Sequence, residues 1–249
     1  MIKEQIERKD KYPIPYSAEI EGNEEKIIIL VNGFGGSKDS PGAAAMLKEF
    51  AQNGFGAVSL DFPAHGINPA DGEYLRIDNC IEDLRAMELF LRKTYPKAEI
   101  CYYSISYGAY ITLLYLTKYK NDGALVFISS GAVNMSEFYQ NLSEENERLL
   151  EKQGFMWEDD GDKPLKITKA FIADLNENDV NEKFAGADLE NVRIKMIHGD
   201  EDEEVDYDKA VAFSERYGIE LVTISGGDHR MTVPGSAQTA MKEALEFYK

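Results

Sequence analysis

Short apolar runs rich in β-branched residues alternate along this chain with segments whose apolar residues recur at helical spacing. Six of these runs are strand candidates, and they cover residues 26–32, 56–62, 98–103, 124–130, 192–198 and 220–225. Their near-continuous hydrophobicity is typical of strands that are buried on both faces. The alternation predicts an α/β fold, in which helices flank a mostly parallel central sheet.

The segments between the strand candidates carry helix signals. Ser40 followed by Pro41 is a capped start for the first helix, and Gly54 is a stop signal. We expect further helices over residues 77–95, 106–123, 206–217 and 236–248. The first 25 residues are compatible with an antiparallel hairpin at the edge of the sheet. A length of 249 residues is sufficient for one such domain, spanning residues 1–249.

One segment interrupts the alternation, because residues 131–191 contain no convincing strand and greatly exceed a normal loop in length. It contains the only tryptophan, Trp157, together with other aromatic residues and an acidic cluster at 158–162. We interpret residues 132–190 as an inserted, largely helical cap over the carboxyl edge of the sheet. A packed layer without a ligand role is the alternative. The aromatic residues that we expect to contact a substrate are Phe138, Phe155 and Trp157.

Charge and composition restrict the partners of the chain. The net charge is −18, from 27 basic and 45 acidic residues, and such a field repels nucleic acid and anionic membrane surfaces. No apolar run reaches the roughly 18 residues that span a bilayer, and no signal peptide is visible at the N-terminus. Cys80 and Cys101 lie in apolar segments without C-x-x-C spacing, which predicts buried, reduced thiols. We therefore expect a cytoplasmic protein.

The stretch Y-Y-S-I-S-Y-G-A-Y, residues 102–110, lies where an apolar run passes into helical spacing. A serine nucleophile on a sharp strand-to-helix turn needs small residues two positions before it and two positions after it. Ser106 has Ser104 and Gly108 at those positions, whereas Ser104 would have the bulky Tyr102. We therefore predict that Ser106 is the nucleophile. An ordinary turn with a helix-capping serine is the alternative.

A serine hydroxyl becomes a good nucleophile only when a neighbouring base removes its proton. The chain has three histidines, and only His229 lies in a glycine-flanked loop just past the last strand candidate. Loops at that edge of an α/β sheet are where ligands bind. We predict that His229 is the base, and that His65 and His198 have structural roles.

The base needs a carboxylate that fixes its tautomer and stabilises its charged form. The acidic run D-E-D-E-E at residues 200–204 follows the strand candidate that ends at His198. Within it Asp202 fits an H-G-x-x-D-x-x-V arrangement that ends at Val205, so we predict Asp202 as the acid. Asp200 is the alternative, and the other charges of the run are expected to be solvated.

Glycines follow the first strand candidate in V-N-G-F-G-G-S, residues 31–37. They allow the backbone to turn its amides inward, where N–H groups stabilise the oxyanion of an acyl-transfer reaction. The expected donors are the backbone amides of Phe34 and Tyr107. A phosphate-binding loop is disfavoured, because neither G-x-x-x-x-G-K-[ST] nor G-x-G-x-x-G is present. The histidines show no H-x-x-x-H spacing, so we expect no metal site, and the predicted chemistry requires no cofactor.

Five motifs in this order together resemble the α/β-hydrolase superfamily, from about Lys26 to the C-terminus. They are N-G-F-G-G (32–36), D-F-P-A-H-G (61–66), S-I-S-Y-G (104–108), H-G-D-E-D-E-E-V (198–205) and G-D-H (227–229). The order Ser, Asp, His along the chain is the order of that fold. The C-terminal half is most similar to bacterial feruloyl and cinnamoyl esterases, which are small serine esterases with an inserted cap. Relatives usually have histidine at Asn32 and glycine at Ser104, and often glutamine at Tyr107.

The resemblance implies a serine esterase that cleaves carboxylic esters of small or aromatic acyl groups, hydroxycinnamoyl groups among them. The substrate would be a small-molecule ester, and the acyl-enzyme would form on Ser106, with His229 as base and Asp202 as its acid. A thioesterase or amidase with the same triad is a close alternative, because it differs only in the leaving group. A catalytically degenerate hydrolase that serves as a binding module is the alternative from another class, and Asn32 and Ser104 motivate it.

Overall fold

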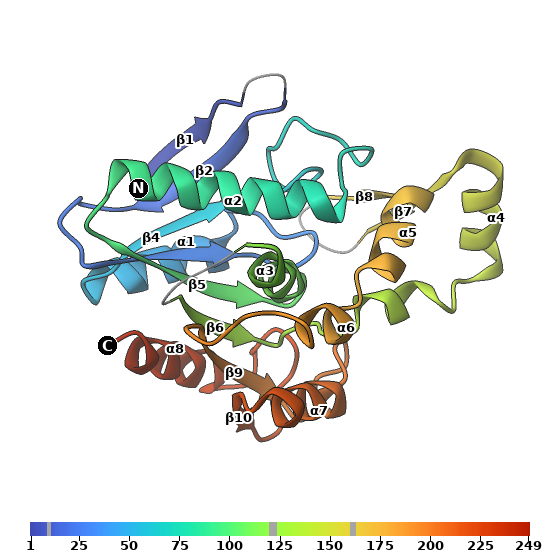
Figure 1. Cartoon of the computed structure of the whole chain (residues 1–249). Coiled ribbons are helices and arrows are strands. Elements are labelled where there is room, and N and C mark those ends of the chain that lie inside the picture. Colours follow the sequence, from blue (N-terminus) through green and yellow to red (C-terminus); the bar gives the residue numbers. More distant parts are fainter. Residues whose placement is uncertain (9–10, 120–123, 160–162) are drawn as a thin grey trace.

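A central sheet of eight strands runs through the described part of this computed structural model, which comprises residues 1–8, 11–119, 124–159 and 163–249. The strands are β1 (Ile2–Ile6), β2 (Ile14–Glu19), β3 (Lys26–Val31), β4 (Gly56–Leu60), β5 (Glu99–Ile105), β6 (Leu125–Ser129), β9 (Arg193–Gly199) and β10 (Glu220–Ile224). Their order across the sheet is β1-β2-β4-β3-β5-β6-β9-β10 (Figure 1).

The sheet is parallel from β4 to β10, and the pairs β1–β2 and β2–β4 are antiparallel. The six strand candidates of the sequence correspond to β3, β4, β5, β6, β9 and β10, and the N-terminal hairpin lies at the sheet edge as β1 and β2. The prediction of a mostly parallel α/β sheet is confirmed.

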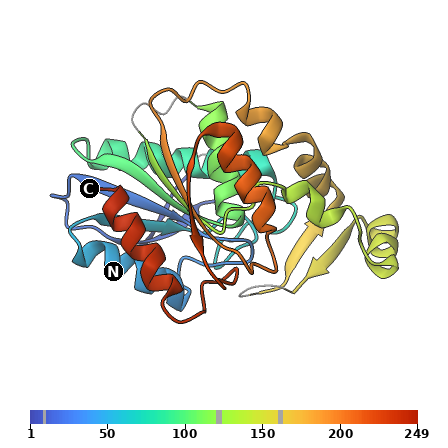
Figure 2. The ribbon, with the colours of Figure 1, turned by 90° about the horizontal axis from the view of Figure 1, so that it is seen from below.

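Helices cover both faces of the sheet (Figures 1 and 2). The helices α1 (Pro41–Gln52) and α8 (Ser236–Phe247) pack on one face, and α2 (Ile77–Thr94), α3 (Tyr107–Lys118) and α7 (Tyr207–Tyr217) pack on the other. Ser40 caps α1 as expected, since its side chain accepts a hydrogen bond from Ala43 N at 3.2 Å. The expected end of α3 near Gly123 lies outside the described residues. No described helix is both long enough and apolar enough to cross a bilayer.

The alternation of side chains along β3 explains the two helical layers. Ile27, Ile29 and Val31 belong to the core that contains α2 and α3, whereas Ile28 and Leu30 face α1 and α8. All five side chains are fully buried. Burying an aliphatic side chain contributes roughly 1.5–3 kcal/mol, so one strand stabilises both layers.

The inserted segment extends beyond the carboxyl ends of the parallel strands (Figures 1 and 2). Its described elements are η1 (Met135–Tyr139), α4 (Glu144–Gln153), β7 (Phe155–Glu158), β8 (Leu165–Thr168), α5 (Lys169–Glu177) and α6 (Val180–Phe184). Strands β7 and β8 pair antiparallel in a sheet of their own, so the expectation that this segment has no strand is wrong. Each strand has only four residues, too few for a clear period of two. Residues 160–162 of the acidic cluster lie outside the described part.

Gly108 marks the closest approach of α3 to the sheet. A Cβ atom at this position would clash with the carbonyl oxygen of Val31 and would lie 2.7 Å from that of Asn32. Because backbone atoms cannot move aside, we expect Gly108→Ala to lower the free energy of unfolding by about 1–3 kcal/mol, as measured by urea denaturation. The control is Gly42→Ala in α1, where a Cβ meets nothing within 4 Å. Equal stability of the two variants would contradict this packing.

Candidate active site

Ser106 lies between the end of β5 and the start of α3, with φ 50° and ψ −117°. A positive φ costs a residue with a side chain on the order of 1–3 kcal/mol. Neighbouring backbone holds the strained conformation, because Ser106 N donates to Ser129 O at 3.1 Å and Ser106 O accepts from Ala132 N at 3.2 Å. A strained serine on a strand-to-helix turn is the geometry of a nucleophile elbow.

Ser104, the other serine of this turn, is fully buried in β5. Its hydroxyl shares a hydrogen bond with Thr112 Oγ1 at 2.8 Å, within the packing between β5 and α3. Ser106, by contrast, lines an open cavity. The two hydroxyls therefore have different surroundings, and only that of Ser106 is placed to meet a ligand.

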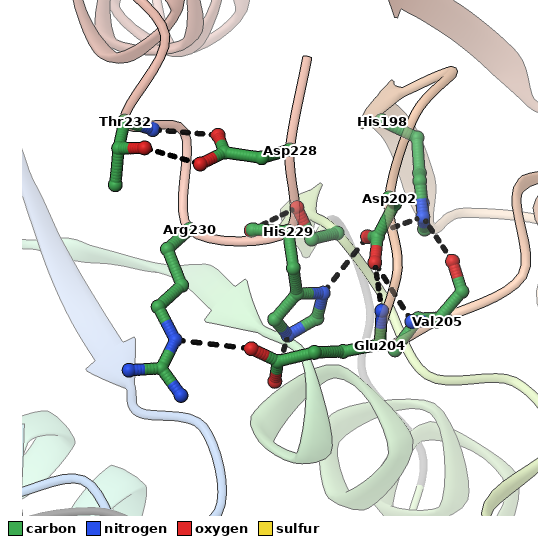
Figure 3. Close-up of polar contacts among 9 residues, drawn as sticks. His198, Asp202, Glu204, Val205, Asp228, His229, Arg230 and Thr232 are labelled. Atoms are coloured by element: carbon green, nitrogen blue, oxygen red, sulfur yellow. Dashed lines mark hydrogen bonds and ion pairs between the residues drawn. The ribbon is translucent and has the colours of Figure 1, made fainter.

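His229 and Asp202 are hydrogen bonded, with 2.8 Å between His229 Nδ1 and Asp202 Oδ2 (Figure 3). The other carboxylate oxygen, Oδ1, accepts from Glu204 N at 2.9 Å and from Val205 N at 2.7 Å. Burial alone would raise the pKa of Asp202, but hydrogen bonds from His198, His229 and Val205 N outweigh it and hold the pKa well below its ordinary range. Asp202 is therefore a permanent anion beside His229.

Asp200, the alternative acid, is turned away from His229. Its Oδ1 accepts a hydrogen bond of 2.6 Å from Gly226 N, in the loop after β10. His198 reaches Asp202 instead, with 2.9 Å between His198 Nε2 and Asp202 Oδ2. The carboxylate of Asp202 thus lies between two imidazoles (Figure 3).

The second ring nitrogen of His229, Nε2, lies 3.6 Å from Glu204 Oε2, and Arg230 Nε pairs with Glu204 Oε1 at 3.0 Å (Figure 3). Among the described residues, no hydrogen bond joins Ser106 Oγ to His229. Hydrogen bonds between catalytic groups often form only when substrate is bound. Ser106 and His229 nevertheless line the same cavity.

This cavity has a volume of about 350 Å³ and lies between the sheet and the inserted segment. Its wall includes Phe34, Ser106, Tyr107, Phe138, Glu158 and His229. A larger hollow of about 500 Å³ between α1 and α8 contains neither Ser106 nor His229. The smaller cavity is therefore the one in which a ligand can reach both Ser106 and His229. Within the described residues, no group of His, Cys, Asp and Glu side chains is arranged to hold a metal ion.

The loop after β3 and the start of α3 bring Phe34 and Tyr107 to the wall beside Ser106. Tyr107 is the first residue of α3, and N–H groups in a first helical turn have no partner within the helix. The loop is fixed from behind, because Asn32 Nδ2 donates to Ser59 Oγ at 2.8 Å and Lys38 N donates to Asp61 Oδ1 at 2.7 Å. Asn32 thus anchors the loop through its side chain.

The side chain of Tyr107 points into the core and does not extend across the cavity. It is fully buried, and its hydroxyl donates to Cys80 Sγ at 3.4 Å. Its ring stacks on His65 with an interplanar angle of 6°, and the ring of Phe34 packs edge-on against both rings at 5.2 and 5.4 Å. This aromatic cluster of Phe34, His65 and Tyr107 fixes the backbone of both expected amide donors.

Of the aromatic residues expected to contact a substrate, Phe138 lines the cavity. Phe155 and Trp157 are not among its lining residues, and Trp157 is 57% exposed. The period of two in β7 explains this, because Met156 is buried and Glu158 lines the cavity, while Phe155 and Trp157 project from the opposite face.

Four further polar and aromatic residues of this wall were not predicted from the sequence as ligand contacts. They are Tyr139, Glu158, Glu204 and Arg230. Tyr139 donates to Glu158 Oε2 at 2.7 Å. Glu158 begins the acidic cluster at 158–162, but only the alternation of side chains along β7 shows that it faces the cavity.

Three comparisons relate the chain to known proteins. The family model described as serine aminopeptidase, S33, matches residues 22–159, which is more than half of the 249 residues. A putative hydrolase from Agrobacterium vitis S4 is 18% identical with a TM-score of 0.81, over 100% of this chain and 98% of that one. No match is found among curated protein sequences.

Two esterases are also among the similar structures. Est1E from Butyrivibrio proteoclasticus, with ferulic acid bound, is 18% identical with a TM-score of 0.77, over 98% of this chain and 99% of that one. The esterase PF2001 from Pyrococcus furiosus is 18% identical with a TM-score of 0.71, over 99% of this chain and 89% of that one. These likenesses establish the fold, which is that of α/β hydrolases, and confirm the fold that the sequence motifs implied.

His65 makes the stability of this region depend on pH. Burial lowers its pKa from 6.5 to about 4, so the unfolded chain takes up the proton first as the pH falls. Stability is therefore lost from about pH 6.5 down to about pH 4. His65→Asn keeps an N–H donor for the Pro63 carbonyl and does not titrate. Between pH 7 and 5 we expect the unfolding free energy of the wild type to drop by about 2 kcal/mol more than that of the variant. If urea denaturation shows the same drop in unfolding free energy for wild type and His65→Asn, this role of His65 is refuted.

Proposed function

The chain belongs to the serine aminopeptidase S33 family of hydrolases, and on this premise we propose that it is a serine esterase acting through an acyl-enzyme on Ser106. The observation that carries the proposal is the shared cavity: the strained Ser106 and the Asp202-backed His229 line it together. The esterase names of two proteins with the same fold support an ester as substrate.

In the proposed mechanism, Ser106 Oγ attacks the carbonyl carbon of the ester while His229 Nε2 takes up the hydroxyl proton. Asp202 stabilises the imidazolium that forms, because its carboxylate is bonded to Nδ1. The negative charge on the carbonyl oxygen is stabilised by the amides of Phe34 and Tyr107. His229 then donates the proton to the leaving alcohol, the ester C–O bond breaks, and the acyl group remains on Ser106.

Hydrolysis of the acyl-enzyme repeats these steps with water as the nucleophile. His229 takes a proton from water, the hydroxide oxygen bonds to the acyl carbon, and the Ser106 Oγ–acyl bond breaks with return of the proton to Oγ. The products are a carboxylic acid and the free enzyme. The ester and one water molecule are the only reactants that the two halves of this reaction need to balance.

The shape of the cavity supports a small or aromatic acyl group. Its volume of about 350 Å³ is near the lower end of ordinary ligand sites. Met135, Phe138 and Tyr139 of the inserted segment line it, so residues 132–190 would act as the cap that covers the acyl group. Ferulic acid bound to Est1E supports hydroxycinnamoyl esters among the substrates.

Amide cleavage is the second candidate, because the family description names an aminopeptidase. Glu158 and Glu204 also place carboxylates on the cavity wall beside Tyr139 and Arg230, and their negative charge favours a substrate that carries an amine. Turnover of matched aryl esters and aminoacyl anilides separates the two candidates. Faster turnover of the anilides would replace the ester proposal.

The assignment of the acid is tested with two neighbouring aspartates. We expect Asp202→Asn to reduce kcat for a p-nitrophenyl ester by roughly 10³- to 10⁴-fold, because the amide cannot stabilise the imidazolium. Asp200→Asn is the matched control and should stay within roughly threefold of wild type, since Asp200 bonds Gly226 N and not His229.

Ser106→Ala is measured beside the two aspartate variants. Because it lacks the nucleophile, it should keep only the weak turnover that the oxyanion-stabilising amides can support. A larger loss in Asp200→Asn than in Asp202→Asn would transfer the acid role to Asp200. Absence of ester turnover in the wild type, with binding of the same compounds intact, would favour the degenerate binding module.

A further inference from the structure

His198 contacts the side of Asp202 opposite to His229 (Figure 3). His198 is the last residue but one of β9 and is fully buried. Its Nε2 lies 2.9 Å from Asp202 Oδ2 and 3.1 Å from Val205 O. Both neighbours of this nitrogen are acceptors, so Nε2 carries the proton and donates. The tautomer of His198 is thereby set by its surroundings.

The other nitrogen of the ring, Nδ1, is buried and has no hydrogen-bond partner in the described part of the chain. A proton on Nδ1 would leave a buried N–H donor without an acceptor, which is unfavourable. His198 therefore donates to Asp202 through Nε2. An ordinary core position would be filled more simply by an apolar side chain, which leaves no ring nitrogen unpaired.

The two oxygens of Asp202 are held by different parts of the fold. Oδ1 is held by two amides of its own loop, from Glu204 and Val205, which fixes the carboxylate at one end. Oδ2 receives His198 from the end of β9 and His229 from the loop after β10. His198 is thus the only strand residue among these four donors.

Other ionisable groups surround the pair. Glu204 lies 3.6 Å from His229 Nε2 and pairs with Arg230, and the ring of Tyr207 lies 6.1 Å from that of His198. None of these donates to Asp202 Oδ2. Within the part of the chain that the structure describes, only His198 shares that oxygen with His229.

We propose that His198 is a positioning residue, whose Nε2–H fixes Asp202 Oδ2 opposite His229 Nδ1 and moderates its basicity. The proposal rests on the proposed function, in which His229 is the base. Donation by His198 draws negative charge from Oδ2, so the carboxylate stabilises the imidazolium without holding the proton on His229 at working pH. Without this donor, Oδ2 becomes more basic and less fixed.

The test compares two replacements of similar size. His198→Gln keeps an N–H donor at about the reach of Nε2, whereas His198→Met has none. In His198→Met we expect kcat for a p-nitrophenyl ester to fall roughly 10- to 100-fold, less than the roughly 10³- to 10⁴-fold loss expected for Asp202→Asn. KM should stay near that of wild type, and the acid limb of the pH profile should move to higher pH. His198→Gln should recover most of kcat and restore the limb.

Two results would overturn the proposal. One is equal activity and equal pH profiles in His198→Gln and His198→Met, which would leave His198 a packing residue. The other is a full additional loss from His198→Met in the Asp202→Asn background, because a residue that acts through Asp202 has nothing to position there.

Imidazole NMR of the ¹⁵N-histidine-labelled protein tests the contact without turnover. We expect His198 as the neutral Nε2–H tautomer, and a low-field His229 Nδ1–H resonance that shifts in His198→Met and not in His198→Gln. A charged or Nδ1–H His198 would refute the proposal even in an active enzyme. If the wild type shows the expected histidine resonances but does not turn over esters, only the proposed function is refuted.

Discussion

The hydrogen bond between His229 Nδ1 and Asp202 Oδ2 joins the loop after β10 to the loop after β9. The two strands are parallel neighbours, so their carboxyl ends meet at one edge of the sheet. The loops approach so closely that a Cβ on Gly199 would clash with the backbone of Gly227, and Glu201 N donates to Gly227 O at 3.1 Å. Glycine at both positions therefore permits the contact on which the proposed chemistry depends.

The same edge of the sheet carries the other components. Ser106 is held at positive φ by backbone hydrogen bonds to the end of β6, and His229 O accepts from Ser130 Oγ at 2.8 Å in the same region. Buried aromatic packing of Phe34 against Tyr107 positions the loop after β3. Strain at Ser106 is thus supported by rigid neighbours, as expected where a side chain must meet a ligand at a fixed position.

Much of this arrangement follows from local sequence rules. The buried parallel strands were predictable from continuous apolar runs, and the distinction between Ser106 and Ser104 followed from the sizes of Tyr102 and Gly108. The acidic run after β9 was harder, because five neighbouring carboxylates differ only in how the loop turns. Asp202 differs from Asp200 because two backbone amides donate hydrogen bonds to its Oδ1, and these hydrogen bonds form only in the folded loop.

Residues in the inserted segment were the least predictable. Trp157 is prominent by composition, yet strand alternation places Glu158 on the cavity wall and leaves Trp157 exposed. Four-residue strands are stabilised by pairing with each other, which a single segment does not reveal. His198 looked like an ordinary strand residue, and its contact with Asp202 depends on the turn that follows β9.

Trapping a covalent adduct shows whether Ser106 is the residue that carries the acyl group. A fluorophosphonate probe should add its mass to the wild type, and peptide mapping should place the adduct on Ser106. Ser106→Ala should remain unmodified under the same conditions. An adduct on Ser104 or on another residue, or labelling that persists in Ser106→Ala, would contradict the role of Ser106 as nucleophile.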